Sequence, residues 1–263
     1  MKTDLDITID NLAFEIAQGL PRAVGGLKQG RLNGAVLLRI CLDHRRLAIA
    51  HLLGTLDMRA YSQHLQQSAR AYAFMLRQAR VGTAVDPYYL CRSRAEPFWD
   101  ALAAGDFPLA AEIAALVPAQ PHPGMEDPVL FLYFDVIMAM ARGEDAARLQ
   151  EKLRVLDAQK DPTLSFRYDA SSALLHGDDA GLAKALEGMG GEHAAWFAEL
   201  GETDSIAPED AQTQTFVFME GLALARLASH LGMREVLPQR FIPDVALSAP
   251  LASFNDPWRT LEG

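Results

Sequence analysis

The stretch Phe98-Trp99-Asp100-Ala101-Leu102-Ala103-Ala104-Gly105-Asp106 decides how the middle of this chain folds. Alanine and leucine favour helix, and glycine accepts the left-handed backbone conformation that ends one. The aspartate that follows the glycine can accept hydrogen bonds from the first free amides of a second helix. The stretch therefore predicts a helix that stops at Gly105 and a second helix that begins after Asp106 and runs to Val117.

The same pattern returns twice further along the chain. Residues 137–144 end in Gly-Glu, and residues 172–178 end in Gly-Asp. The three glycines lie 38 and 34 residues apart, within the period range of helical-hairpin repeats. The helices after the second and third glycines are expected over 146–156 and 181–189. Because one hairpin cannot bury its apolar face alone, we expect the hairpins to stack into a repeat-like array.

Two long antiparallel helices are expected before this array. Apolar side chains recur at helical spacing over 33–53 and over 57–80, with a short interruption between them. Strand-like alternation does not continue beyond residues 5–9. The glycine-rich segment 24–30 lacks the spacing of a phosphate-binding loop and follows no buried strand, so we interpret it as a turn between helices.

The C-terminal part is expected to hold one more helix, over 211–231, followed by an irregular tail from Pro238. The chain as a whole is thus predicted to be all-α. Its N-terminal helical region covers residues 1–94, and the hairpin array with its irregular tail covers residues 95–263. We expect the two regions to form one continuous domain.

Composition is consistent with a protein that folds around an apolar core. Half of the 263 residues are hydrophobic, which suffices for a large core without disulfides or metals. Cys41 and Cys91 belong to no paired motif, and we expect both to be buried. The N-terminal segment lacks a signal-peptide pattern, and the apolar stretch 129–141 is shorter than the roughly 20 residues that cross a bilayer. These features predict a cytoplasmic protein without a membrane partner.

The net charge of −10 is unevenly distributed. Residues 1–100 hold 13 basic and 9 acidic side chains (+4), whereas residues 101–263 hold 11 and 25 (−14). The acidic part disfavours nucleic acid and favours a basic protein as partner. The candidate partner-binding residues are pairs of carboxylates expected at helix starts: Glu144, Asp145, Asp178, Asp179, Glu209 and Asp210. The alternative is that these acids only cap the helices and solvate their ends.

The three tryptophans, Trp99, Trp196 and Trp258, are most simply interpreted as core residues. A tryptophan on the surface would instead be a candidate for a strong contact with a partner protein, because exposed aromatic side chains often dominate interface energies.

No known catalytic motif is present in the sequence. It has no GxSxG nucleophile, no P-loop, no HExxH and no EF-hand loop. His44, His51 and His64 could come together on adjoining helices, but the neighbouring arginines disfavour a bound cation. We therefore expect no metal, no cofactor and no enzymatic activity. The alternative is an enzyme whose site is assembled from these histidines and distant carboxylates.

Three segments carry a resemblance to a known family. An aromatic-rich stretch at 216–228 continues into Leu231-Gly232-Met233 and then into Phe241-Ile242-Pro243-Asp244. Together with 98–106, these segments resemble the immunity protein 49 family, over about the C-terminal two-thirds of the chain. The residues that correspond most closely are Glu220, Arg226, Ile242 and Pro243.

Members of that family are predicted all-α proteins of bacterial polymorphic toxin systems, in which an immunity protein is paired with a toxin. The resemblance implies a protein that binds and neutralises a cognate toxin and has no catalytic residues. The alternative from the repeat pattern alone is a helical-repeat adaptor or regulatory scaffold that holds a peptide or helix of a partner protein.

Overall fold

The computed structural model describes residues 3–234, 239–254 and 256–261, and every regular element in these residues is a helix. The all-α prediction is confirmed. Besides twelve α-helices, the described residues form five short 3-10 helices: η1 (Leu27–Gln29), η2 (Pro87–Leu90), η3 (Arg92–Arg94), η4 (Pro162–Leu164) and η5 (Arg259–Leu261). None of the helices in the described residues combines the length and the hydropathy that a bilayer-spanning helix needs.

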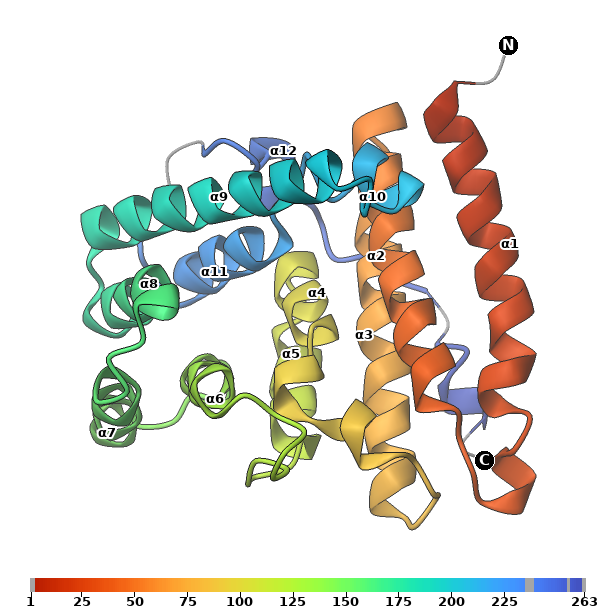
Figure 1. Ribbon diagram of the computed structural model, residues 1–263, viewed down its shortest axis with the longest axis horizontal. Helices are drawn as coiled ribbons and strands as arrows, with labels where there is room; N and C mark the ends of the chain where they lie inside the picture. Colours follow the sequence, from red (N-terminus) through yellow and green to blue (C-terminus); the bar gives the residue numbers. More distant parts are fainter. Residues whose placement is uncertain (1–2, 235–238, 255, 262–263) are drawn as a thin grey trace.

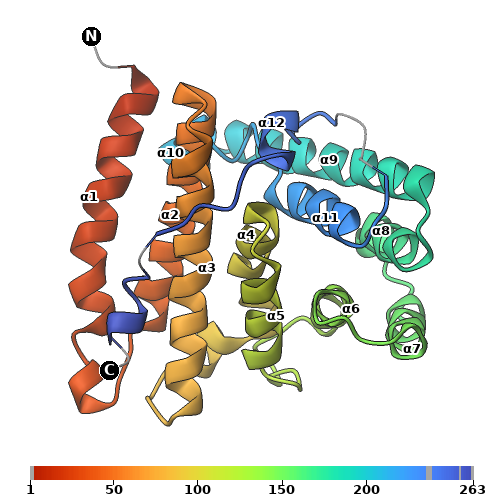
Figure 2. The same ribbon diagram turned by 180° about the vertical axis from the view of Figure 1, so that it is seen from behind.

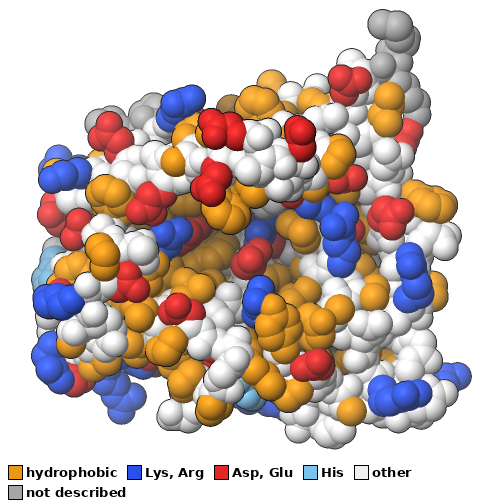
Figure 3. Space-filling model, in the orientation of Figure 1, with side chains coloured by type: hydrophobic (Ala, Val, Ile, Leu, Met, Phe, Trp, Pro, Cys, Tyr) orange, Lys and Arg blue, Asp and Glu red, His pale blue; other side chains and the backbone are white. Residues whose placement is uncertain are grey.

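Three long antiparallel helices form one side of the molecule (Figures 1 and 2). They are α1 (Asp4–Val24), α2 (Gly34–Thr55) and α3 (Met58–Arg80), and α2 packs on both of the others. The predicted helices 33–53 and 57–80 correspond closely to α2 and α3. The helices that follow enclose a hollow on the face shown in Figure 1, which the space-filling view in Figure 3 shows clearly.

The expected pair of N-terminal helices is corrected to three, because the sequence pattern does not predict α1. A capping box begins this helix: the Thr3 hydroxyl accepts from the Asp6 amide, and the Asp6 carboxylate accepts from the Thr3 amide. The buried stripe of α1 is narrow and includes a threonine and a glycine: Thr8, Leu12, Gly19 and Ala23. A stripe with two residues of low hydrophobicity gives little periodic signal.

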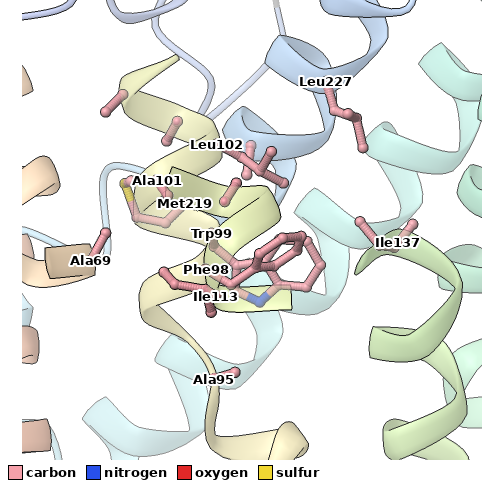
Figure 4. Close-up of a cluster of buried hydrophobic side chains, with 14 of the residues drawn as sticks. Ala69, Ala95, Phe98, Trp99, Ala101, Leu102, Ile113, Ile137, Met219 and Leu227 are labelled. Atoms are coloured by element: carbon pink, nitrogen blue, oxygen red, sulfur yellow. The ribbon is translucent and has the colours of Figure 1, made fainter. Parts of the chain in front are cut away.

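The centre of the core is α4 (Pro97–Ala104), all of whose residues are buried. It packs against α3, α5 (Phe107–Leu116) and α11 (Met219–His230). In Figure 4 the rings of Phe98 and Trp99 lie among side chains from several of the surrounding helices. The short alanines on the rest of α4 allow those helices to approach from all sides, and the one charged residue of α4, Asp100, is buried as well.

After α5 come two hairpins, α6 (Pro128–Ala141) with α7 (Ala146–Asp157) and α8 (Ser165–His176) with α9 (Asp179–Glu202). Each helix from α5 to α9 packs on the next (Figure 1). Gly105, Gly143 and Gly177 have φ of 76°, 68° and 66°, so the predicted left-handed helix stops are confirmed. The caps that follow them are Asp106, Asp145 and Asp178, each accepting a hydrogen bond from a backbone amide three residues later.

The predicted helix 181–189 is much longer in the structure, where α9 has 24 residues. Glycines inside α9 do not end it. At Gly188 a Cβ would lie 2.5 Å from the ring of Phe166 on α8, so the missing side chain lets α8 and α9 pack closely.

The predicted helix 211–231 is wrong in its first third. The chain instead forms α10 (Pro208–Gln212), a turn, and then α11, which begins at Met219. The amide of Phe218 donates to the carbonyl of Phe241 at 2.8 Å, a contact across the chain that sequence periodicity cannot show.

The C-terminal tail is largely irregular, as predicted, although its expected first residue, Pro238, lies outside the described residues. The tail includes the short α12 (Asp244–Leu247) and crosses α3 on the face shown in Figure 2. It is anchored by Trp258, which is buried against Phe74. Buried residues of the N-terminal region and of the tail belong to the same hydrophobic cluster.

Candidate functional site

A cleft of about 610 Å³ opens below α9. Its lining comes from α2, α4, α6, α8, α9 and the start of α11, so residues far apart in the sequence meet there. Figure 3 looks into this hollow, whose walls are mostly hydrophobic with charged side chains between them. A volume of this size and an apolar lining with a few polar groups are typical of binding sites.

One face of α9 forms the upper wall. Met189, Glu192, His193, Trp196 and Phe197 follow helical spacing and all line the cleft. The buried residues of α9 are Leu182, Ala185, Leu186 and Met189, all in its first half, whereas none of its residues from 190 to 202, all of which the structure describes, is buried. The apolar stripe nevertheless continues to Trp196, whose side chain is 58% exposed. The stripe therefore extends beyond the helices that cover it.

An ion pair lies in the wall opposite. Arg167 on α8 donates from Nε and Nη2 to Glu220 on α11 at 3.0 and 2.9 Å, and from Nη1 to Glu192 at 2.9 Å. The Tyr133 hydroxyl donates to Glu220 at 2.7 Å. Burial and the charge of Glu220 raise the pKa of Tyr133, so it stays protonated and acts as a donor. The cluster holds α6, α8, α9 and α11 together around the cleft.

A second buried ion pair supports the other side. Arg45 on α2 donates from Nε to Asp100 at 2.6 Å and from Nη1 to Glu96 at 3.0 Å. Asp100 is fully buried on α4 and also accepts from the Ser68 hydroxyl at 2.5 Å. Burial raises the pKa of Asp100, but Arg45 and Ser68 oppose this change. Three donors, two from Arg45 and one from Ser68, thus bind this carboxylate.

The charges that face solvent at this cleft are negative. The side chains of Glu96 and Glu192 are 58% and 36% exposed, whereas those of Arg45 and Arg167 are 7% and 21% exposed. An incoming group therefore meets carboxylates and the Trp196 ring first, which favours a basic and apolar ligand.

The predicted acidic pairs at the starts of α7 and α9 do not line this cleft. Asp145 and Asp178 are exposed and act as helix caps, so the capping alternative accounts for both. Glu144 pairs with Arg142, and Asp179 accepts from the Arg234 amide at 3.1 Å. A role for these four residues in partner binding stays a prediction.

The third acidic pair lies on α10. Asp210 accepts from Nε and Nη2 of the buried Arg46 at 2.7 and 2.5 Å, and its side chain is only 17% exposed. This carboxylate ties α10 to α2. Glu209 is half-buried beside it.

The four residues of the family resemblance are spread over two places. Glu220 is in the cleft, whereas Arg226 donates to the carbonyls of Leu247 and Ala249 and so fastens the tail to α11. Ile242 is buried, and Pro243 precedes α12.

The three histidines do come together, between α2 and α3. His44 and His64 lie with their Nδ1 atoms 3.1 Å apart, and the ring of His51 stacks on that of His64. Burial lowers the pKa of His44 to about 3 and that of His64 to about 4, so both are neutral at pH 7. In the described residues no group of three His, Cys, Asp or Glu side chains is arranged to hold a metal ion.

Cys41 and Cys91 are free thiols and are buried, which confirms that prediction. Trp99 and Trp258 are core residues as expected, and Trp196 is not.

No motif or spacing in the sequence marks Arg167, Glu192 or His193 as site residues. Two signals pointed to this region. First, a single aspartate, Asp100, within an apolar helix implies a buried cation as its partner. Second, Trp196 follows Met189 by seven residues and so continues the same apolar face beyond the expected helix end.

No family model, no curated protein and no solved structure matches this chain.

Proposed function

We propose that this chain is a bacterial immunity protein that binds and neutralises a cognate toxin in the cytoplasm, and that the cleft below α9 receives a segment of that toxin. The observation that carries the proposal is the uncovered end of the α9 stripe, where Trp196 stands 58% exposed at an aromatic-lined cleft. Exposed tryptophans beside a desolvated pocket are typical energetic centres of protein interfaces. The family resemblance of 216–228 and 241–244 supports a toxin as the partner.

The chemistry of the cleft defines the toxin segment. Trp196 and Phe197 offer apolar contact area, and Glu96 and Glu192 offer exposed carboxylates. The matching segment has one or two apolar side chains next to a lysine or arginine. A basic partner of an acidic protein also associates faster, because opposite net charges steer the encounter.

The test begins with affinity purification of the tagged chain from cells of its source organism. The proposal expects one stoichiometric protein that is toxic when expressed alone and harmless when the chain is co-expressed. A Trp196→Ser variant should lose protection. Phe14→Ser is the matched control, because Phe14 is 61% exposed on α1 and does not line the cleft. Equal protection by both variants, or a partner without toxicity, would sink the proposal.

The same experiment separates a toxin from the ligand of a helical-repeat adaptor. An adaptor that holds a short linear segment would release its partner when a synthetic peptide of that segment is added. Several partners sharing such a segment, none of them toxic, would favour the adaptor.

A further inference from the structure

A second cleft, of about 860 Å³, lies away from the first between the C-terminal ends of α3 and α5 and the helices α6 and α7. Both clefts touch α6, but on different faces: Leu130 and Phe134 line the first, and Phe131 and Asp135 line the second. Nothing in the proposed function uses this second cleft.

The second cleft is basic in a protein whose net charge is −10. Its charged lining residues are four cations, Arg80, Arg92, Arg142 and Lys152, and one anion, Asp135. Two more carboxylates act from just outside: Glu144 pairs with Arg142, and Glu126 influences Arg92. Even with these counted, four cations face three carboxylates.

The three arginines of the lining also have a structural role, because each donates a hydrogen bond to a carbonyl at or just after the end of α5. Arg80 donates to the carbonyl of Ala115, Arg142 to that of Ala114 at 2.7 Å, and Arg92 to that of Pro118 at 2.9 Å. These carbonyls belong to the last turn of α5 and the residues after it, where cations are favoured. Lys152 on α7 contacts none of these carbonyls; in the described residues its acceptor is Asp135.

Arg92 and Arg142 lie close enough for their charges to interact. Burial lowers the pKa of Arg92, and the charge of Arg142 lowers it further, although Asp135 opposes both. Lys152 is 27% exposed, and an ammonium group has three donors, so it keeps capacity for a ligand after bonding Asp135. An anion placed between Lys152, Arg142 and Arg80 would balance the surplus.

The rest of the lining is apolar. Leu76, Leu90, Leu116 and Val117 contribute to the walls, and the Arg92 guanidinium lies over the Phe131 ring, 4.3 Å from its centroid. Guanidinium groups match the geometry of phosphate oxygens, and the volume suffices for a small organic molecule.

We infer that this second cleft is a binding site for a small organic phosphate, with the phosphate group held by Lys152, Arg142 and Arg80 and the organic part against Phe131 and the leucines. The inferred role is binding alone.

The test is isothermal titration calorimetry of the full chain at low, fixed ionic strength, with phenyl phosphate and with inorganic phosphate as probes. We expect phenyl phosphate to bind, and to bind more tightly than inorganic phosphate because of the apolar walls. Lys152→Met should weaken phenyl phosphate binding about tenfold, the effect of losing one charged hydrogen bond. Arg148→Met, also on α7 but 74% exposed and absent from the lining, is the matched control and should change affinity less than twofold.

Circular dichroism and a thermal midpoint for each variant separate lost binding from lost folding. Arg80→Met is a second variant with the same expected loss of phenyl phosphate affinity.

Absence of binding by the wild-type chain at millimolar probe would overturn the proposal, as would equal losses of affinity in Lys152→Met and Arg148→Met. Equal affinities for the two probes would refute the inference that the organic part of the ligand packs against the apolar walls. Displacement of phenyl phosphate by a hexaglutamate peptide at lower concentration would assign the cleft to an acidic protein segment instead. Trp196→Ser should bind phenyl phosphate normally, so the two proposals fail independently.

Discussion

Three of the four charged residues on α2 lie inside this protein rather than on its surface. Asp43, Arg45 and Arg46 are consecutive or nearly so and are all buried. Each is satisfied by an ion pair: Arg46 with Asp43 and Asp210, and Arg45 with Asp100 and Glu96. Buried pairs of this kind add little net stability, but losing one partner leaves an uncompensated charge.

The Arg167–Glu220 pair at the cleft should obey this rule. Arg167→Met leaves Glu220 with the Tyr133 hydroxyl as its remaining donor among the contacts described above, and should lower the free energy of unfolding by about 2 to 4 kcal/mol. Urea denaturation checks this value. As a control, Arg154→Met breaks the exposed Glu151 pair on α7 and should leave the urea midpoint unchanged. Equal effects of the two substitutions would contradict the role of the partly buried Arg167–Glu220 pair.

The stacked histidines should make stability fall in acid. Both His44 and His64 have a pKa below the unfolded value of about 6.5, at about 3 and about 4, so the unfolded chain binds protons first as pH falls. Stability should therefore decrease from pH 7 downward until the folded-state values are reached. By pH 5 the loss is about 2 kcal/mol for each of the two histidines.

Urea midpoints measured between pH 7.5 and 5 check this dependence. The double variant His44→Gln, His64→Gln should show a flatter slope, whatever its stability at pH 7. His176→Gln, at an exposed position on α8, should keep the wild-type slope. A slope unaffected by the double substitution would show that other groups set the acid sensitivity.

At the scale of elements, local signals account for much of what the sequence predicts. Each glycine that is followed by an acidic residue in the repeated pattern does mark a helix end. A left-handed glycine and an N-capping aspartate act on the nearest turn and need no distant partner. Predictions failed where distant contacts decide: the start of α11 depends on Phe241, and Gly188 is tolerated in α9 because of Phe166. The α1 helix was missed because its buried stripe is short of apolar residues.

Among the three glycine stops, Gly105 should respond to alanine more strongly than Gly143 and Gly177. At Gly143 a Cβ meets nothing within 4 Å, so Gly143→Ala should cost about 1 kcal/mol, the strain of a left-handed alanine. At Gly105 a Cβ would lie 2.1 Å from Nη2 of Arg226, which also holds the tail. Gly105→Ala should therefore cost at least about 1 kcal/mol more, measured by urea denaturation. Equal costs would show that Arg226 adapts freely.

At the scale of the whole molecule, the candidate site could not have been predicted from the sequence. Arg45, Trp99, Tyr133, Arg167 and Trp196 come from five different helices, and their meeting depends on how α9 crosses the hairpins below it. The sequence predicts a binding surface at the acidic pairs that begin helices, but helix capping is enough to explain acidic residues at those positions. The exposed tryptophan was foreseen only as a possibility, since the seven-residue spacing from Met189 does not show which helices cover it.

The central claim is that one partner protein contacts this cleft through Trp196, and its most direct test is a titration of the co-purified partner. Calorimetry should compare the wild-type chain with Trp196→Ser, Glu192→Gln and the control Phe14→Ser. We predict that Trp196→Ser weakens binding at least about 30-fold, as for an interface hot spot, that Glu192→Gln weakens it less, and that Phe14→Ser changes it less than about twofold. Unchanged affinity in Trp196→Ser, with the variant folded, would contradict the account.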